Sequence, residues 1–190
     1  MAATDDILTP FRPEDERIRT KLGYRGPQNY READFFNHMH ASQVRERLDR
    51  PVWDSFFKFC FERNPWDKAI SLYYWRYRSF RHFPGLLRLA GRGINQVMVP
   101  SITRMVSAYD MYSINGEVAV DFIGQYERLD QDLGYVASRL ELPGSLYPLP
   151  QAKRNLRADT RHYREVLSPA GREGIAEACH RENELLGYRW

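Results

Sequence analysis

Arg63 and Ser71 are the two residues whose types and spacing best suit the binding of a phosphate group. Arg63 directly follows a short aromatic run, and Ser71 lies eight positions later, roughly two turns into the helix expected there. A guanidinium offers a forked pair of N–H donors and a hydroxyl offers one more, so the two side chains could hold one phosphate from two sides. An arginine after a strand also forms structural ion pairs, which is the simpler role for Arg63.

The segment that positions these residues is predicted to be a strand, a tight turn and a helix. FFKFCFE, residues 56–62, is a short aromatic run with one interior lysine and is typical of a strand. Asn64-Pro65 ends it, and Pro65 can occupy the first position of a helix over residues 66–78. Because α/β proteins bind anions outside the carboxyl ends of their strands, this arrangement places Arg63 where an anion would be held.

Other elements follow from local signals. A helix is predicted over residues 42–49, with Ser42 as its N-cap and Pro51 beyond its end, and a β-hairpin over 106–127 that turns at Asn115-Gly116. A C-terminal helix is predicted with Ser168 as its N-cap. The remaining predictions are helices over 15–22, 85–89, 127–140 and 168–186, a Pro-rich loop over 143–150, and a peripheral surface segment over 1–30.

The length predicts one domain over residues 1–190, and the composition excludes several classes of protein. The chain has 190 residues, of which 43% are apolar and 14% aromatic, with a formal charge of +3. No apolar stretch is long enough to span a membrane, and the acidic N-terminus is unlike a secretory signal peptide. The two cysteines, Cys60 and Cys179, are too few for a disulfide framework or a zinc site, so a cytoplasmic location is expected.

Positive charge is concentrated in the middle of the chain. Residues 58–104 contain nine basic and two acidic side chains, for a net +7, and the remainder sums to −4. A local anionic ligand and a solvated basic face both explain this distribution. Within it, YYWRYRSFRHF interleaves aromatic residues with Arg76, Arg78 and Arg81, which suits the wall of a ligand-binding site. The preferred interpretation is a half-buried helix, and a nucleic-acid-binding module over 73–92 is a competing hypothesis.

The string RNPWDKAISLY at 63–73 resembles the 3′-phosphate-binding motif of the carbohydrate branch of the sulfotransferase family, R-N-P-W/F-D-R/K-x-x-S-x-Y. The resemblance covers residues 30–190, with further segments in the same order. They are NHM at 37–39, WDSFFKFCFE at 53–62, VDFIGQYERLDQDLGYVASRLELP at 120–143, RHYREVLSP at 161–169 and ELLGYRW at 184–190. It implies a P-loop-NTPase-like fold, with a parallel sheet flanked by helices.

The resemblance implies that the protein transfers a sulfonate group from 3′-phosphoadenosine-5′-phosphosulfate (PAPS) to a hydroxyl of a carbohydrate or glycolipid acceptor, without a metal. By analogy, Arg63 and Ser71 bind the 3′-phosphate of the donor. Lys153, Arg154 and Arg157 fall where the family brings a second basic segment over the nucleotide. A solvated basic turn explains these three residues equally well.

Two further residues have a possible role in the same reaction. His38 falls where the family places the histidine that faces the acceptor, so it is the candidate general base. Its alternative is a structural role, as the cap of the following helix. Trp66 could stack on a ring of a ligand, but an aromatic residue at a helix start more often packs in the core.

The P-K-T/C-G/A-T-T/S loop with which family members open has no counterpart in this sequence, and DDILTPFRPEDE resembles the segment that follows that loop. The loop and its strand would hold the 5′-phosphosulfate and stabilise the transferring sulfonate. We therefore expect the first strand and the phosphate loop to be missing and the 190-residue chain to have little or no sulfotransferase activity. A pseudoenzyme that keeps the fold for partner binding is the remaining alternative.

Overall fold

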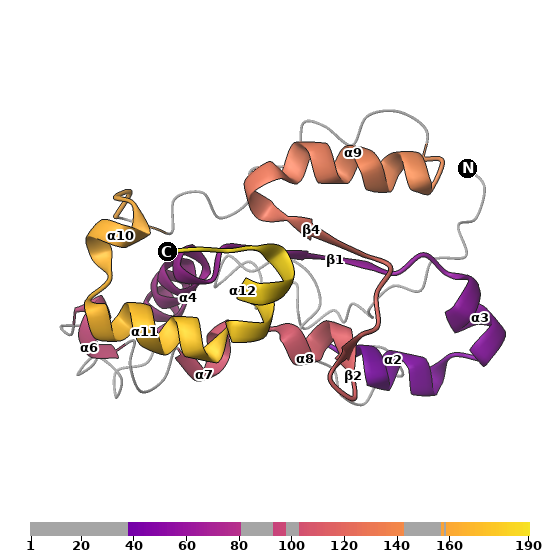
Figure 1. Cartoon of the computed structure of the whole chain (residues 1–190), viewed down its shortest axis with the longest axis horizontal. Coiled ribbons are helices and arrows are strands. Elements are labelled where there is room, and N and C mark those ends of the chain that lie inside the picture. The colour runs from indigo at the N-terminus through magenta and orange to yellow at the C-terminus, as the bar shows by residue number, and fades with distance from the viewer. Residues whose placement is uncertain (1–37, 81–92, 98–102, 143–156, 158) are drawn as a thin grey trace. The chain divides into compact units, whose positions relative to one another are not determined.

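The computed structural model describes residues 38–80, 93–97, 103–142, 157 and 159–190 of the chain. It is an α/β structure with a small parallel sheet flanked by helices, as the sequence predicts (Figure 1). The chain divides into two compact units, Met1–Phe56 with Asp110–Ala119, and Phe57–Tyr109 with Val120–Trp190. The second unit contains Arg63, Ser71 and Arg157, and the first contains His38.

The first unit is built from short helices and a tight hairpin. Helix α2 (Ala41–Arg47) begins after His40, whose backbone N–H donates to Gln43 Oε1 at 3.0 Å. The prediction that Ser42 is the N-cap is therefore wrong, because Ser42 already lies in the first turn. The turn at Asn115-Gly116 is confirmed, since both residues have positive φ, 53° and 83°, as a type I′ hairpin turn requires.

Two elements of this unit differ from the prediction. Pro51 lies in the first turn of α3 (Arg50–Ser55), a helix that is absent from the sequence-based predictions. The hairpin strands β2 (Ser113–Ile114) and β3 (Glu117–Val118) are much shorter than the predicted 106–127 hairpin. Part of that segment is instead α8 (Tyr109–Tyr112), and part is a strand of the other unit.

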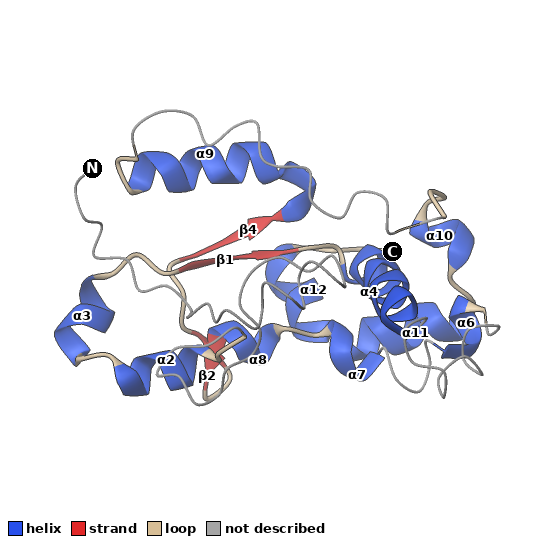
Figure 2. Ribbon diagram, turned by 180° about the vertical axis from the view of Figure 1, so that it is seen from behind, coloured by secondary structure: helices blue, strands red, loops and turns tan. Residues whose placement is uncertain are grey.

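In the second unit, β1 (Phe59–Glu62) pairs in parallel with β4 (Phe122–Gln125), so that Glu62 lies opposite Gln125. The strand-turn-helix prediction is confirmed, with α4 (Pro65–Phe80) directly after the turn. After β4, a 3₁₀ turn η3 (Tyr126–Arg128) leads into α9 (Leu129–Arg139), which lies alongside β4 in both views (Figure 2). Both strands thus end at the same edge of the sheet.

The core of this unit forms where α4 packs against the C-terminal helices. These are α10 (Tyr163–Val166), α11 (Pro169–Ala178) and α12 (His180–Leu186). The short helices α6 (Ile94–Val97) and α7 (Thr103–Val106) also belong to this unit. Trp66 is 3% exposed and stacks on Tyr163, with ring centroids 6.1 Å apart. Its indole N–H donates to the Arg172 carbonyl at 3.0 Å, so Trp66 is a core residue, as preferred from the sequence.

The predicted C-terminal helix over 168–186 is two helices. Ser168 caps α11 as predicted, since its hydroxyl accepts from the Gly171 N–H at 3.2 Å. Cys179 leaves the helical region, with φ −111° and ψ 27°, and separates α11 from α12. Cys179 is fully buried, whereas Cys60 is partly exposed.

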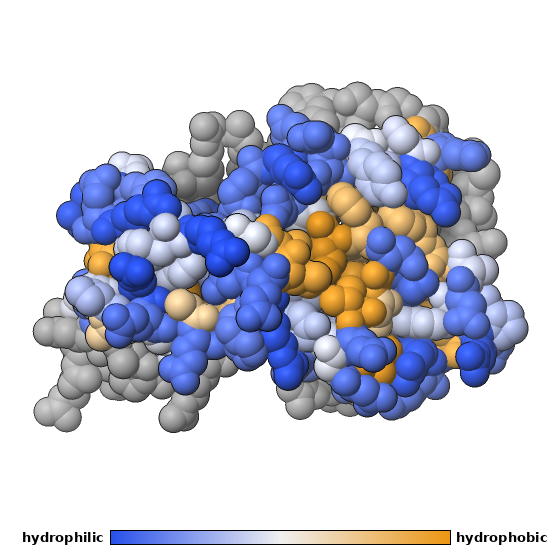
Figure 3. Space-filling model, viewed as in Figure 1, coloured by the Kyte–Doolittle hydropathy of each residue, from blue (hydrophilic) through white to orange (hydrophobic). Residues whose placement is uncertain are grey.

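Apolar side chains reach the surface beside the β1–β4 sheet (Figure 3). Phe59 of β1 and Leu140 and Leu142 after α9 are all exposed.

Among the described residues, no helix is both long and apolar enough to cross a bilayer. Several predictions lie outside the described residues, namely the helices over 15–22 and 85–89, the loop over 143–150, and Arg81, Lys153 and Arg154.

Candidate anion-binding site

The turn between β1 and α4 is held by Asn64, which caps the helix. Its Oδ1 accepts hydrogen bonds from the backbone N–H groups of Trp66 and Asp67, at 3.1 and 3.2 Å. Pro65 has no N–H, so the first free amides of α4 already have partners within the protein. An anion at this turn would therefore be bound by side chains rather than by the helix terminus.

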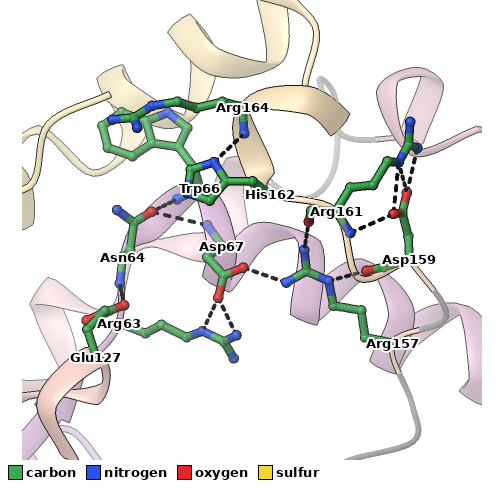
Figure 4. A network of polar contacts seen from close by, with 10 residues as sticks. All are labelled: Arg63, Asn64, Trp66, Asp67, Glu127, Arg157, Asp159, Arg161, His162 and Arg164. Carbon is green, nitrogen blue, oxygen red and sulfur yellow. Dashed lines mark hydrogen bonds and ion pairs between the residues drawn. The ribbon is translucent and has the colours of Figure 1, made fainter.

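Glu127, just after β4, fixes the same turn from the neighbouring strand (Figure 4). Its Oε1 accepts the Asn64 N–H at 2.7 Å, and its Oε2 accepts the Tyr188 hydroxyl at 2.9 Å. Burial, and then the hydrogen bond to Glu127, raise the pKa of Tyr188. No local signal in the sequence marks Glu127 as a site residue. Glu127 follows a predicted strand, but this position indicates a site residue only when the pairing of β4 with β1 is known.

Arg63 extends from the end of β1 and is oriented by two neighbours. Its Nε donates to Asp67 Oδ2 at 2.6 Å and its Nη2 pairs with the same oxygen, while the guanidinium lies over the Tyr126 ring, 4.6 Å from its centroid. The structural ion pair considered for Arg63 is thus present. Nη1 has no hydrogen-bond partner among the described residues, so the guanidinium keeps donors for a further ligand.

Arg157 reaches the same carboxylate from the segment before α10. Its Nη1 donates to Asp67 Oδ1 at 2.5 Å, its Nε to the Asp159 carbonyl at 2.5 Å and its Nη2 to the Arg161 carbonyl at 2.6 Å. Two of the predicted site residues, Arg63 and Arg157, are therefore brought together through Asp67. The sequence motif contained Asp67 but gave no sign of this bridging role.

The segment around Arg157 is itself ordered by a local ion pair. Arg161 Nη2 donates to Asp159 Oδ2 at 2.6 Å, and Arg161 also donates its backbone N–H to Asp159 Oδ1 at 3.1 Å. These hydrogen bonds, the side-chain one first, lower the pKa of Asp159 to about 2. Asp159 is consequently ionised at neutral pH and balances the charge of Arg161.

Ser71 stands one turn beyond Asp67 on the same face of α4, since the two residues are four positions apart. Its side chain is partly buried, and its hydroxyl has no hydrogen bond to another described residue. Tyr74 continues this face toward the Arg157–Asp159 segment. Burial, and then the Asp159 carboxylate, raise its pKa, whereas Arg157 and Arg161 lower it.

Lys68, the second basic residue of the motif, is directed elsewhere. Its Nζ lies 2.8 Å from Oε2 of Glu62, which is 3% exposed, and the Arg63 N–H donates to the same oxygen at 3.3 Å. Glu62 Oε1 is buried and has no partner among the described residues. Burial, and then the Glu62 carboxylate, raise the pKa of Cys60 to about 12, so its thiol is protonated at neutral pH.

His38 belongs to the first unit, where its side chain is exposed and its backbone has a φ of 62°. The capping role considered for it falls to His40. The His40 backbone bonds Gln43, and its Nδ1 lies 2.9 Å from the Asp110 carbonyl oxygen. Lys153 and Arg154 lie outside the described residues, as does any contact that they make.

The site therefore consists of two half-buried guanidiniums bridged by one carboxylate, beside a helix face that carries a hydroxyl. The side chains of Arg63, Asp67 and Arg157 are 22–25% exposed, so they are partly shielded from solvent but accessible. Guanidinium and hydroxyl donors in this arrangement suit a phosphate-type anion. Within the described part of the chain, no cluster of three or more His, Cys, Asp or Glu residues could hold a metal ion.

Comparison with known proteins finds similarity to an archaeal protein. An uncharacterised protein of Archaeoglobus fulgidus is 34% identical to this chain over 137 residues, which cover 68% of this chain and 100% of the relative. No protein-family model matches the chain. No solved structure matches it.

Proposed function

The chain belongs to the same family as the uncharacterised Archaeoglobus fulgidus protein. From its own residues, we propose that the chain is a sulfotransferase. The donor would be PAPS, and the acceptor a hydroxyl group of a carbohydrate or glycolipid. The proposal rests on the resemblance of residues 30–190 to the carbohydrate sulfotransferases and on the geometry around Arg63. It includes a P-loop-NTPase-like architecture, with which the parallel pairing of β1 and β4 is compatible.

The placement of Arg63 is the observation that carries the proposal. Its guanidinium lies at the carboxyl edge of a parallel sheet, against the face of α4 that also carries Ser71. Nη1 of Arg63 and the Ser71 hydroxyl have no partner among the described residues, so both are available to oxygens of the 3′-phosphate. Arg157 adds a second positive charge beside them, held on Asp67 at 2.5 Å.

The other proposed roles rest on the resemblance alone. Lys153 and Arg154 would bind the nucleotide together with the Arg157 segment. His38 would remove the proton from the acceptor hydroxyl, whose oxygen attacks sulfur. As that S–O bond forms, the S–O bond to the 5′-phosphate breaks, and adenosine 3′,5′-bisphosphate leaves with the electron pair.

Binding of adenosine 3′,5′-bisphosphate to the 190-residue chain tests the donor site directly. Isothermal titration should give tighter binding of this nucleotide than of adenosine 5′-monophosphate, because only the former carries the 3′-phosphate. Arg63→Ala should remove that preference, with a loss of about tenfold or more in affinity for the bisphosphate, as expected when a charge-assisted contact is lost. Arg63→Lys should restore only part of it, since an ammonium lacks the planar fork.

Arg45→Ala is the matched control. Arg45 is exposed on α2 in the first unit, so its substitution removes the same charge and none of the contacts described around Arg63. It should leave the preference for the 3′-phosphate unchanged. A wild-type chain that binds both nucleotides equally, or neither, would contradict the proposed function.

A further inference from the structure

Asp67 is the residue around which the proposed donor site is organised. Its two carboxylate oxygens are divided between two arginines, with Oδ2 accepting from Arg63 and Oδ1 from Arg157. Asp67 is 23% exposed, so both ion pairs lie in partly shielded surroundings, where they are stronger than in open solvent. One negative charge between two positive charges leaves the group with a net charge of +1.

The first pair determines how Arg63 presents its donors. With Nε and Nη2 on Asp67 and the guanidinium plane on the Tyr126 ring at 4.6 Å, the side chain is fixed on one edge and one face. Nη1 is the nitrogen left over for a ligand among the described contacts. Without Asp67, the long side chain of Arg63 would sample several rotamers. The entropy lost when a ligand ordered this side chain would then weaken binding.

The second pair fastens a distant segment of the chain to the same point. All three nitrogens of Arg157 have partners, two of which are carbonyl oxygens of its own turn, at Asp159 and Arg161. Arg157 therefore shapes this turn and ties it to α4, across 90 positions in the sequence, by its bond to Asp67. The N–H donors of Arg157 are therefore less available to a phosphate than Nη1 of Arg63.

We propose that Asp67 is a positioning residue of the donor site, which sets the orientation of Arg63 and the attachment of the Arg157–Arg161 turn together. This inference rests on the proposed function. An asparagine cannot replace Asp67 in this role, because its amide nitrogen would face the N–H donors of one of the two arginines. A glutamate keeps both acceptors and the charge, at a slightly different reach.

The test measures the preference for the 3′-phosphate, defined as the ratio of the dissociation constants of adenosine 5′-monophosphate and adenosine 3′,5′-bisphosphate. Asp67→Asn should lower this ratio by about tenfold in the full chain, although it removes a negative charge from an anion site. Asp67→Glu should recover most of the preference. Circular dichroism and thermal unfolding establish that each variant is folded, and a purely structural role would lower the melting temperature without changing the ratio.

The possible outcomes separate this inference from the proposed function. An unchanged or increased ratio in a folded Asp67→Asn chain overturns the positioning role while the donor site stands. A wild-type chain without any preference overturns the proposed function and this inference with it. If Asp67→Asn does not fold, Asp67→Ala replaces it, because it removes both carboxylate oxygens and leaves Arg63 and Arg157 in the chain. The ratio should again fall by about tenfold, and an unchanged ratio overturns the inference.

Discussion

The ammonium of Lys68 lies 2.8 Å from Oε2 of Glu62, a carboxylate that is only 3% exposed at the end of β1. In the sequence, Glu62 directly precedes Arg63 and Lys68 directly follows Asp67. The ion pair between them nevertheless lies toward the interior of the unit and not in the candidate site. A buried charge is costly unless it is paired, so the lysine is needed because the glutamate is present. The two residues should therefore be energetically coupled.

Lys68→Met is expected to destabilise the protein by roughly 2–3 kcal/mol. This figure lies somewhat below the range for fully buried pairs, because the Lys68 side chain is 27% exposed. Urea unfolding followed by circular dichroism measures the loss. The double variant Lys68→Met with Glu62→Leu should recover most of it, since no unpaired charge then remains. A double variant whose loss equals the sum of the losses of Lys68→Met and Glu62→Leu would show that the pair is not coupled.

Asn64→Ala should weaken both the fold and nucleotide binding. Loss of a helix cap costs about 1 kcal/mol, and here two amides lose their acceptor next to Arg63. Ser168→Ala is the matched control, because it removes the cap of α11 at a similar cost. Titration with adenosine 3′,5′-bisphosphate should then show weaker binding for Asn64→Ala and unchanged binding for Ser168→Ala. Equal effects of the two variants on binding would argue that the β1–α4 turn has no special role.

Elements with a local signal could be predicted from the sequence. The aromatic run before Pro65, the Ser168 cap and the Asn115-Gly116 turn are each determined by neighbouring residues, and all three are present. The pairing of β1 with β4 could not be predicted in the same way, because the strands are 63 positions apart in the chain. The break at Cys179 also has no local marker, since neither proline nor glycine occurs there.

The sequence predicts several residues of the candidate site, but it does not predict the contacts that join them. Residue type and resemblance predict Arg63, Ser71 and Arg157 as site residues, and the structure brings Arg63 and Arg157 together. The roles of Asp67 and Glu127 depend on tertiary contacts across 90 and 63 positions, respectively. Such contacts are decided by how the elements pack, which residue spacing alone does not determine.

The two cysteines should be unreactive at neutral pH. Burial, more than the neighbouring carboxylates, raises the pKa of both thiols from 9.0 to about 12. The reactive thiolate is then roughly a thousandfold scarcer than in an unfolded chain at the same pH. Labelling with Ellman's reagent at pH 8 should be much slower for the native protein than in guanidinium chloride. Rapid labelling of Cys60, which is partly exposed, would contradict its raised pKa.

The same shifts predict a loss of stability at alkaline pH. A thiol whose pKa is raised by folding binds its proton more tightly in the native state, so its contribution is complete below pH 9 and is lost as the pH rises toward 12. Urea unfolding between pH 8 and 11 should show this decline. A Cys60→Ser, Cys179→Ala variant should show a flatter dependence, whatever its stability at pH 7. An identical slope in both proteins would assign the decline to other groups.

Gly124→Ala should destabilise the sheet that carries the candidate site. Gly124 is buried in β4 opposite Phe61, and a Cβ at this position would overlap the Phe61 ring. Overpacking of this kind costs about 1–3 kcal/mol, and Phe61→Leu in the same chain should relieve part of it.

Gly134→Ala is the matched control for that substitution. Gly134 lies in α9 with open space around its Cβ position, so alanine should stabilise the protein by up to about 1 kcal/mol through helix propensity. Opposite signs for the two glycine substitutions in urea unfolding would establish that close approach of β4 to the Phe61 ring requires glycine at 124. Equal effects would contradict it. Because Arg63 and Glu127 leave these two strands at the same edge, Gly124→Ala should also weaken binding of adenosine 3′,5′-bisphosphate, whereas Gly134→Ala should not.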